Sequence, residues 1–183
     1  PAVYTRGCAS VICGDKTGTL TQNMLTVVDV WTLRDGERPM ALTIGALCND
    51  TVLTYGEDKS PKTAGDPTET AFVDIACKEG IDKNELEKTM PREAELPFDS
   101  ERKMMSTIHP LAAGGYRVMV KGAPDVLLGR CLVSKEDADR VLTQNSEMAG
   151  RALRVLGVAY KDIPSIPAEL TSEDLENGLT FVG

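Results

Sequence analysis

The sequence is poor in the residues that mark several common kinds of site. Aromatic residues make up 4% of the 183 positions, and His109 is the single histidine. The 5 cysteines are odd in number and no two are spaced as CxxC, so the sequence indicates neither a zinc site nor a closed disulfide framework. We therefore expect reduced thiols in a reducing compartment.

Long apolar runs and an excess of positive charge are also missing. No run approaches the ~20 residues that a helix needs to cross a membrane. The 20 basic and 28 acidic side chains give a net charge of -8, so we expect no nucleic-acid partner. The length suffices for one well-buried domain. The chain opens at Pro1 with neither an initiator methionine nor a signal peptide, which predicts a segment cut from a longer protein.

Capping residues and apolar spacing predict five helices. Asp66, Pro67 and Glu69 form the expected start of one of them, with a cap, a first-turn proline and an acid three residues after the cap. Another begins at the cap Ser134 with an apolar stripe of Val141, Leu142 and Met148. The predicted helices cover residues 39–47, 66–80, 82–90, 124–127 and 134–150.

Alternating apolar residues predict strands. Residues 104–108 and 116–120 alternate on either side of Gly114-Gly115, the pattern of a β-hairpin. Further strands are predicted at residues 24–33, 154–160 and 179–182, and residues 51–65 are expected to form an exposed loop. The predicted class is therefore α+β, a mainly antiparallel sheet flanked by helices.

The most specific motif is DKTGTLT, residues 15–21. An aspartate at the end of a strand, facing a loop of backbone N–H groups, can attack a phosphoryl group to give an acyl phosphate. Gly18 permits close backbone approach, and Lys16 supplies charge near the transferring group. Taken from these residues alone, a solvated Asp-Lys-Thr turn is an equal alternative. The motif is not a Walker A loop, since GxxxxGK[ST] occurs nowhere.

DKTGTLT followed by Gln22-Asn23 resembles the phosphorylation signature of the P-type ATPases, within the haloacid-dehalogenase-like superfamily. The resemblance implies that Asp15 is the nucleophile, with Lys16 and Thr17 beside it, and that Asp15 and Thr17 help to hold Mg²⁺ in the intact pump. Related phosphatases carry a second acid where this chain has Thr17. Its absence implies an aspartyl phosphate that lasts long enough to drive transport.

Two further segments resemble elements of the family's nucleotide-binding domain. Lys121 and Gly122 begin a KGAPD run similar to the element whose lysine lies in the ATP pocket. Phe98 and Lys103 match a segment in which a phenylalanine stacks on adenine and a lysine reaches the phosphates, and Met105 is expected to pack against the base. From the residues alone, Lys121 can also be a lysine that merely flanks a strand.

The start of the helix at residue 66 resembles another element of that domain. There Thr68 and Glu69 fall where the family places contacts to adenine, while Asp66 serves as the helix cap. Arg154 matches the family arginine that contacts the phosphates, although an arginine in a strand is more often a surface residue. His109-Pro110 is similar to a pair in heavy-metal pumps, but those pumps lack the KGAP element, so we interpret His109 as structural.

The resemblance implies a division of the chain into three parts. Residues 1–23 form a stub of the phosphorylation domain, 24–177 the nucleotide-binding domain, and 178–183 a hinge strand back to the phosphorylation domain. The resemblance implies that the full-length protein is a membrane cation pump that uses ATP and Mg²⁺ and is most similar to the calcium pumps. It places the residues of this chain in the cytoplasm. Its partners are its own phosphorylation, actuator and membrane domains.

Alternatives to that function remain open at this point. They are a pump for magnesium or another cation, a stand-alone nucleotide-binding module, and a soluble phosphatase of the same superfamily. Alone, the fragment is expected to be monomeric and to bind nucleotide without catalysis.

Overall fold

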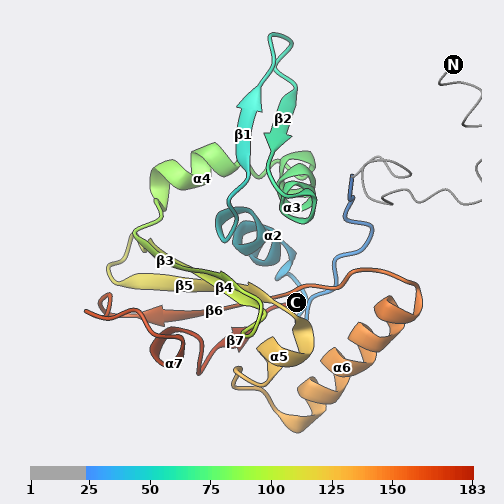
Figure 1. The fold of residues 1–183 in the computed structure, drawn as a ribbon, viewed down its shortest axis with the longest axis vertical. Helices are drawn as coiled ribbons and strands as arrows, with labels where there is room; N and C mark the ends of the chain where they lie inside the picture. Colours follow the sequence, from blue (N-terminus) through green and yellow to red (C-terminus); the bar gives the residue numbers. More distant parts are fainter. Residues whose placement is uncertain (1–23) are drawn as a thin grey trace, which may run out of the picture.

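Residues 24–183 are described by a computed structural model of the chain (Figure 1). The helices in this part are α2 (Arg38–Leu47), α3 (Pro67–Lys78), α4 (Lys83–Thr89), α5 (Pro124–Leu128), α6 (Lys135–Gly150) and α7 (Ser172–Leu175). The strands are β1 (Val52–Tyr55), β2 (Pro61–Ala64), β3 (Ala94–Asp99), β4 (Met104–Pro110), β5 (Tyr116–Gly122), β6 (Gly157–Ile163) and β7 (Thr180–Phe181). Within these residues no helix has the length and apolar character of a membrane span.

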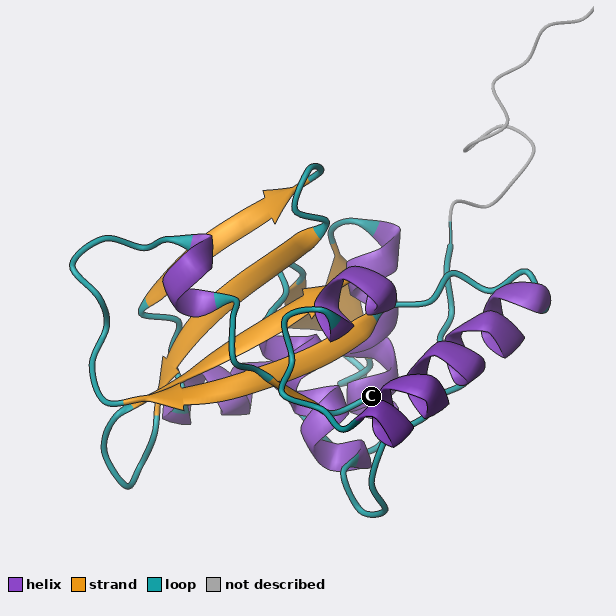
Figure 2. Cartoon of the chain, turned by 90° about the horizontal axis from the view of Figure 1, so that it is seen from below, coloured by secondary structure: helices purple, strands orange, loops and turns teal. Residues whose placement is uncertain are grey.

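Five strands form the main sheet in the order β3-β4-β5-β6-β7, and every neighbouring pair is antiparallel. Figure 1 shows α2, α3 and α4 on one side of this sheet and α5, α6 and α7 on the other, and Figure 2 shows the strands lying alongside one another. The predicted class, a mainly antiparallel sheet flanked by helices, is confirmed.

Helices cover both faces of the central strands, so β4 and β5 are buried on each side. One core cluster joins Met104 of β4 to Leu127 of α5 and Leu175 of α7. On the opposite face Met105 packs with Ile44 of α2. Neighbouring residues of one strand point to opposite faces, so the two methionines enter two separate cores.

The polar residues of β4 are buried as well, and each has a hydrogen-bond partner: Ser106 bonds to the carboxylate of Glu176, and Thr107 and His109 bond to each other. His109 lies with its Nδ1 2.8 Å from the carbonyl oxygen of Met90 and its Nε2 2.9 Å from Oγ1 of Thr107. Burial lowers the pKa of His109, which favours the neutral ring. The structural interpretation of this histidine is confirmed.

Helix α3 begins as its sequence predicts. Asp66 Oδ1 accepts a hydrogen bond from the backbone N–H of Thr68 at 2.8 Å, and Pro67 occupies the first turn. Helix α2 packs closely beside α3, because a Cβ added at Gly45 would lie 2.4 Å from Cδ1 of Phe72. The absence of a side chain at Gly45 therefore lets the two helices approach.

Two predicted segments differ from the structure at the edges of the fold. Residues 24–32 form no strand: Val30 and Trp31 pack their side chains against the two cores. The backbone N–H of Leu33 donates to Val182 at 2.8 Å. The expected loop at residues 51–65 is instead the hairpin β1–β2, which projects beyond α3 in Figure 1. Its strands are mostly exposed, Leu53 of β1 being the one buried residue in them, and their sequence shows no apolar alternation.

Two details of the second half also need correction. The strand expected from residue 154 begins at Gly157, because Ala152 adopts a left-handed turn after α6 and the ladder to β5 starts only at Gly157. Leu142, predicted in the apolar stripe of α6, is 42% exposed, whereas Val141 and Met148 are buried.

Candidate functional site

The site forms where four strands end or begin along one edge of the main sheet. Asp99 of β3 is paired with Met104 of β4, Met104 with Gly122 of β5, and Gly122 with Gly157 of β6. These four residues make a continuous row across the sheet, which we call the edge row. Of the residues predicted from sequence to bind nucleotide, Gly122 belongs to this row, Phe98, Lys103 and Lys121 each adjoin a member of it, and Arg154 lies three residues before Gly157.

The start of α3 adds the remaining predicted residues. Lys121 Nζ lies 2.7 Å from Oε1 of Glu69, and Arg154 Nη1 donates to Oγ1 of Thr68 at 2.9 Å. Two contacts thus connect the first turn of α3 to the edge row. The structure brings Thr68 and Glu69 together with Lys121 and Arg154, as the family pattern implies.

Lys121 is enclosed on several sides. Its side chain is 8% exposed and that of Glu69 18%. The ammonium nitrogen also lies 5.9 Å from the centre of the Phe72 ring, within the range of a cation–π contact. The second carboxylate oxygen of Glu69 accepts from the backbone N–H of Asp50 at 3.0 Å. Both partners of this ion pair are therefore held in place.

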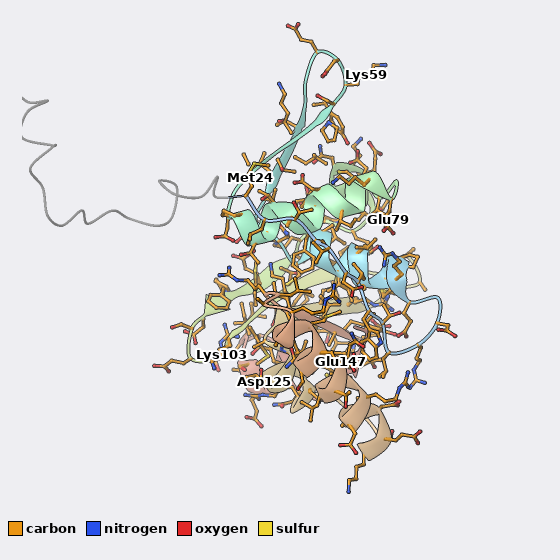
Figure 3. The ribbon with its side chains drawn as sticks, turned by 90° about the vertical axis from the view of Figure 1, so that its right-hand side faces the viewer. Met24, Lys59, Glu79, Lys103, Asp125 and Glu147 are labelled. Carbon is orange, nitrogen blue, oxygen red and sulfur yellow. The ribbon has the colours of Figure 1, made fainter. Side chains whose placement is uncertain are left out.

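The other two cations of the edge are open to solvent. Lys103 and Arg154 are exposed, and neither forms an ion pair within residues 24–183. Figure 3 shows Lys103 on a loop that stands out from the sheet. With Lys121 matched by Glu69, the charge available for an anion at this edge comes from Lys103 and Arg154.

Phe98 presents its ring to solvent rather than to either core. It is 65% exposed, one of the most exposed large apolar side chains of the described chain. An aromatic ring open to solvent offers a surface on which a base can stack, and Lys103 and Arg154 leave positive charge near the same end of the sheet.

Gly122 is required by the close approach of two backbone segments. A Cβ built at this position would lie 2.6 Å from the carbonyl oxygen of Lys103, and that same oxygen accepts from the N–H of Ala123 at 3.1 Å. Lys103 itself has a φ of 54°, in the left-handed region. The absence of a side chain at Gly122 therefore allows the Lys103 loop to sit on the end of β5.

Met105 does not take the predicted place. Its side chain is 1% exposed and lies in the core with Cys48 and Met119. A ring stacked on Phe98 would not touch it, because Met105 points into the interior on the α2 side of the sheet. We correct its assignment from a base contact to a core residue.

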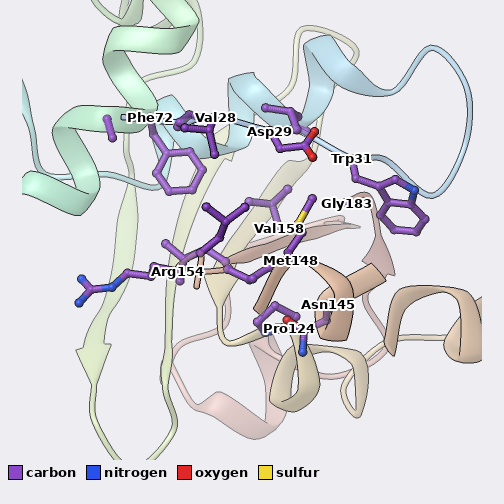
Figure 4. A pocket seen from close by; sticks show the side chains of 18 of the residues that line it. Val28, Asp29, Trp31, Phe72, Pro124, Asn145, Met148, Arg154, Val158 and Gly183 are labelled. Carbon is purple, nitrogen blue, oxygen red and sulfur yellow. The ribbon is translucent and has the colours of Figure 1, made fainter. Parts of the chain in front are cut away.

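A cavity of about 290 Å³ adjoins the edge row and was not anticipated from the sequence. Figure 4 shows Val28, Phe72, Met148 and Val158 around it, with Arg154 at its side. Sequence reasoning missed it because residues 24–33 were expected to form a strand. Its lining is mainly apolar, shares Gly157 with the edge row, and also includes Thr68 and Arg154.

The predicted catalytic residues Asp15, Lys16 and Thr17 lie outside the described residues. Within residues 24–183 no group of three or more His, Cys, Asp or Glu side chains is arranged to hold a metal ion. What the described part offers at this end of the sheet is an exposed aromatic ring, Phe98, and two exposed cations, Lys103 and Arg154.

The comparisons with known proteins all indicate the same protein family. The sequence model of the family described as P-type ATPase, cytoplasmic domain N, matches residues 39–183. A calcium-transporting ATPase of Listeria monocytogenes is 39% identical over 207 aligned residues, which take in 100% of this chain and 23% of the relative. A calcium-transporting ATPase of Lactococcus lactis is 40% identical over 203 residues, covering 100% of this chain and 22% of the relative.

A more distant relative carries a broader name. A cation-transporting ATPase of Synechocystis is 33% identical over 224 residues, covering 100% of this chain and 24% of that protein. The chain thus spans about a quarter of the length of the curated relatives that it matches.

Proposed function

The chain belongs to the P-type ATPase family, whose cytoplasmic domain N it carries, and from this premise we propose that the edge row and the start of α3 bind ATP for a cation pump. One observation carries the proposal: the strand register aligns Asp99, Met104, Gly122 and Gly157, and Phe98, Lys103 and Lys121 each adjoin a member of this row, with Arg154 three residues before Gly157.

The residues present suit an adenine nucleotide. The exposed ring of Phe98 offers a stacking surface for the base, and Lys103 and Arg154 offer charge for the phosphates. Lys121 and Glu69 lie between them as a pair that can both donate and accept hydrogen bonds. Thr68 completes the site by orienting the guanidinium of Arg154.

For the intact pump we propose that ATP bound here transfers its γ-phosphoryl group to Asp15. Lys16 and Thr17 would assist at the phosphorylation loop, and Asp15 and Thr17 are the residues of this chain that we propose for Mg²⁺. The metal would neutralise charge on the phosphoryl oxygens. Thr17 lacks the acid–base function of a carboxylate, which supports a lasting phosphoenzyme rather than a phosphatase.

The transported ion is proposed to be calcium, since the relatives named above include calcium-transporting ATPases. Another cation is the alternative, supported by the more general name of the Synechocystis relative. We propose the domain division 1–23, 24–177 and 178–183, and a cytoplasmic position on a membrane protein for this part.

The binding site is tested by NMR on the 183-residue chain. Titration with ADP or ATP is expected to shift the backbone amides of the edge row and of the first turn of α3. The amides of the hairpin β1–β2, which projects away from this edge, serve as the internal control. Shifts confined to the hairpin, or no shifts at all, would overturn the proposal.

A further inference from the structure

Arg102 lies within the loop that carries Phe98 and Lys103, yet its side chain is only 23% exposed. Its Nη1 donates to a carboxylate oxygen of Glu176, and its Nη2 donates to the carbonyl oxygen of Pro97 at 2.6 Å. Since Pro97 immediately precedes Phe98, this guanidinium joins the backbone beside the exposed ring to the carboxylate at the end of α7.

Glu176 is a buried carboxylate at the end of α7, 74 residues further along the chain. It also accepts hydrogen bonds from the hydroxyls of Ser106 in β4 and Ser172 in α7. Burial alone would raise the pKa of Glu176, but the bonds from Arg102, Ser106 and Ser172 outweigh it and hold the pKa below its ordinary value. The carboxylate is therefore charged at neutral pH and fixed by three donors.

The sheet itself does not fix the backbone at Phe98. The β3–β4 register shifts between Leu96 and Asp99, so Pro97 and Phe98 stand outside the regular ladder. Pro97 has no N–H to donate. The bond from Arg102 thus supplies an anchor at a place where strand pairing is interrupted.

Taking nucleotide binding at this site as the basis, we propose that Arg102 and Glu176 are positioning residues for the nucleotide. The buried carboxylate of Glu176 orients the guanidinium of Arg102, and this guanidinium holds Phe98 in place for stacking on the base. A ring held ready before binding loses less freedom when the base arrives. The loop has a second support in Asp99, whose Oδ1 accepts from the backbone N–H groups of Glu101 and Arg102 at 2.9 and 2.8 Å.

The test replaces both partners together, because removing one would leave the other charge buried and unpaired. The variant Arg102→Met/Glu176→Gln is compared with wild type by calorimetric titration with ADP, well below the unfolding temperature of each protein. The ADP affinity of the folded protein is expected to fall by roughly threefold to tenfold. The stoichiometry should stay near one, whereas partial unfolding would lower the stoichiometry instead.

A thermodynamic cycle separates positioning from general destabilisation. If Arg102 and Glu176 act through Phe98, replacing both of them should lower ADP affinity by less than about twofold in a protein that already carries Phe98→Ala. The matched control is Arg117→Ala, which breaks an ion pair to Asp162 (2.7 Å) at the opposite end of β5. It should lower the unfolding temperature and leave ADP affinity unchanged.

The outcomes distinguish this inference from the proposed function. If wild type fails to bind ADP, the proposed function falls. The positioning role alone is overturned if wild type binds ADP and Phe98→Ala weakens binding, but replacing Arg102 and Glu176 leaves ADP affinity unchanged. It is also overturned if that replacement weakens binding equally in wild type and in Phe98→Ala.

Discussion

Lys121 in β5 and Glu69 in α3 form an ion pair of 2.7 Å that is largely closed to solvent. The two residues are 52 positions apart in sequence, and their contact holds the first turn of α3 against the edge row. Lys103, the other lysine of the site, is exposed. The two lysines therefore differ in how strongly dissolved salt can screen them.

That difference gives a first prediction. Lys103→Ala and Lys121→Ala should each weaken ATP binding by about tenfold at low ionic strength, as expected for a lost charged hydrogen bond. At 0.5 M salt, where the screening length is roughly 4–5 Å, the loss from Lys103→Ala should nearly vanish and that from Lys121→Ala should largely persist. Calorimetric titrations at two salt concentrations measure this. Equal salt sensitivity of the two variants would contradict the enclosed position of Lys121.

Phe98 should contribute to binding by stacking rather than by charge. Phe98→Ala removes a surface worth ~1–3 kcal/mol per base, so ATP affinity should fall by roughly fivefold to a hundredfold, using 1.4 kcal/mol per decade. The loss should be the same at low and high salt. Tyr55→Ala, which removes another exposed ring at the distant hairpin, is the control and should leave affinity unchanged. An unaltered affinity of Phe98→Ala would place the base elsewhere.

Gly122→Ala tests whether the Lys103 loop depends on close backbone approach. The added methyl would meet the carbonyl oxygen of Lys103 at 2.6 Å, and a backbone atom cannot move aside as a flexible side chain would. We expect a loss of ~1–3 kcal/mol in the free energy of unfolding together with weaker ATP binding. Gly150→Ala is the control, because a Cβ there meets nothing within 4 Å. Chemical denaturation and calorimetry measure both effects.

Local features of the fold could be predicted from the sequence because each depends on neighbouring residues. The cap at Asp66, the stop after Thr89 and the hairpin at Gly114-Gly115 are of this kind. The family resemblance pointed to Thr68, Glu69, Lys121 and Arg154, which the structure brings into contact in two pairs, while their role in binding stays a prediction. The hairpin β1–β2 was missed because its strands are mostly exposed and carry no apolar alternation.

Contacts between distant segments could not be predicted in the same way. Met105 was expected to contact the base because it lies close to Lys103 in sequence, but the pleat of β4 directs its side chain into the core. The pairing of Arg102 with Glu176 depends on how α7 docks on the sheet, and neither residue's neighbours in sequence indicate it. Such features become visible only when the strand register is known.

The single histidine permits a direct pH prediction. Burial holds the pKa of His109 below its usual value of 6.5 in the folded state, so the unfolded chain binds more protons as the pH falls past 6.5. The stabilisation is therefore complete above pH 6.5 and is lost as the pH falls through the folded pKa. The free energy of unfolding should decrease across that window in wild type and much less in His109→Gln. Denaturation at several pH values, with NMR titration of the ring, measures both quantities, and a ring pKa above 6.5 would contradict the burial.

The last prediction separates binding from chemistry. We expect the 183-residue chain to bind ATP but to form no stable acyl phosphate at Asp15. Phosphoryl transfer requires charge on the γ-phosphoryl oxygens to be neutralised and the group to be held in line with the nucleophile. Within residues 24–183 no group of three or more acidic, histidine or cysteine side chains is arranged to hold a metal ion that could do this. In a full-length pump, Asp15→Asn should abolish phosphorylation, because an amide cannot act as the nucleophile. The same change should leave ATP affinity within about twofold of wild type, since Asp15 is not one of the residues proposed to bind ATP. Incubation with radioactive ATP followed by hydroxylamine, which cleaves acyl phosphates, measures the phosphorylation, and equilibrium binding measures the affinity. Hydroxylamine-sensitive label on the 183-residue chain would show that the chain holds a complete catalytic site and would overturn this division of roles.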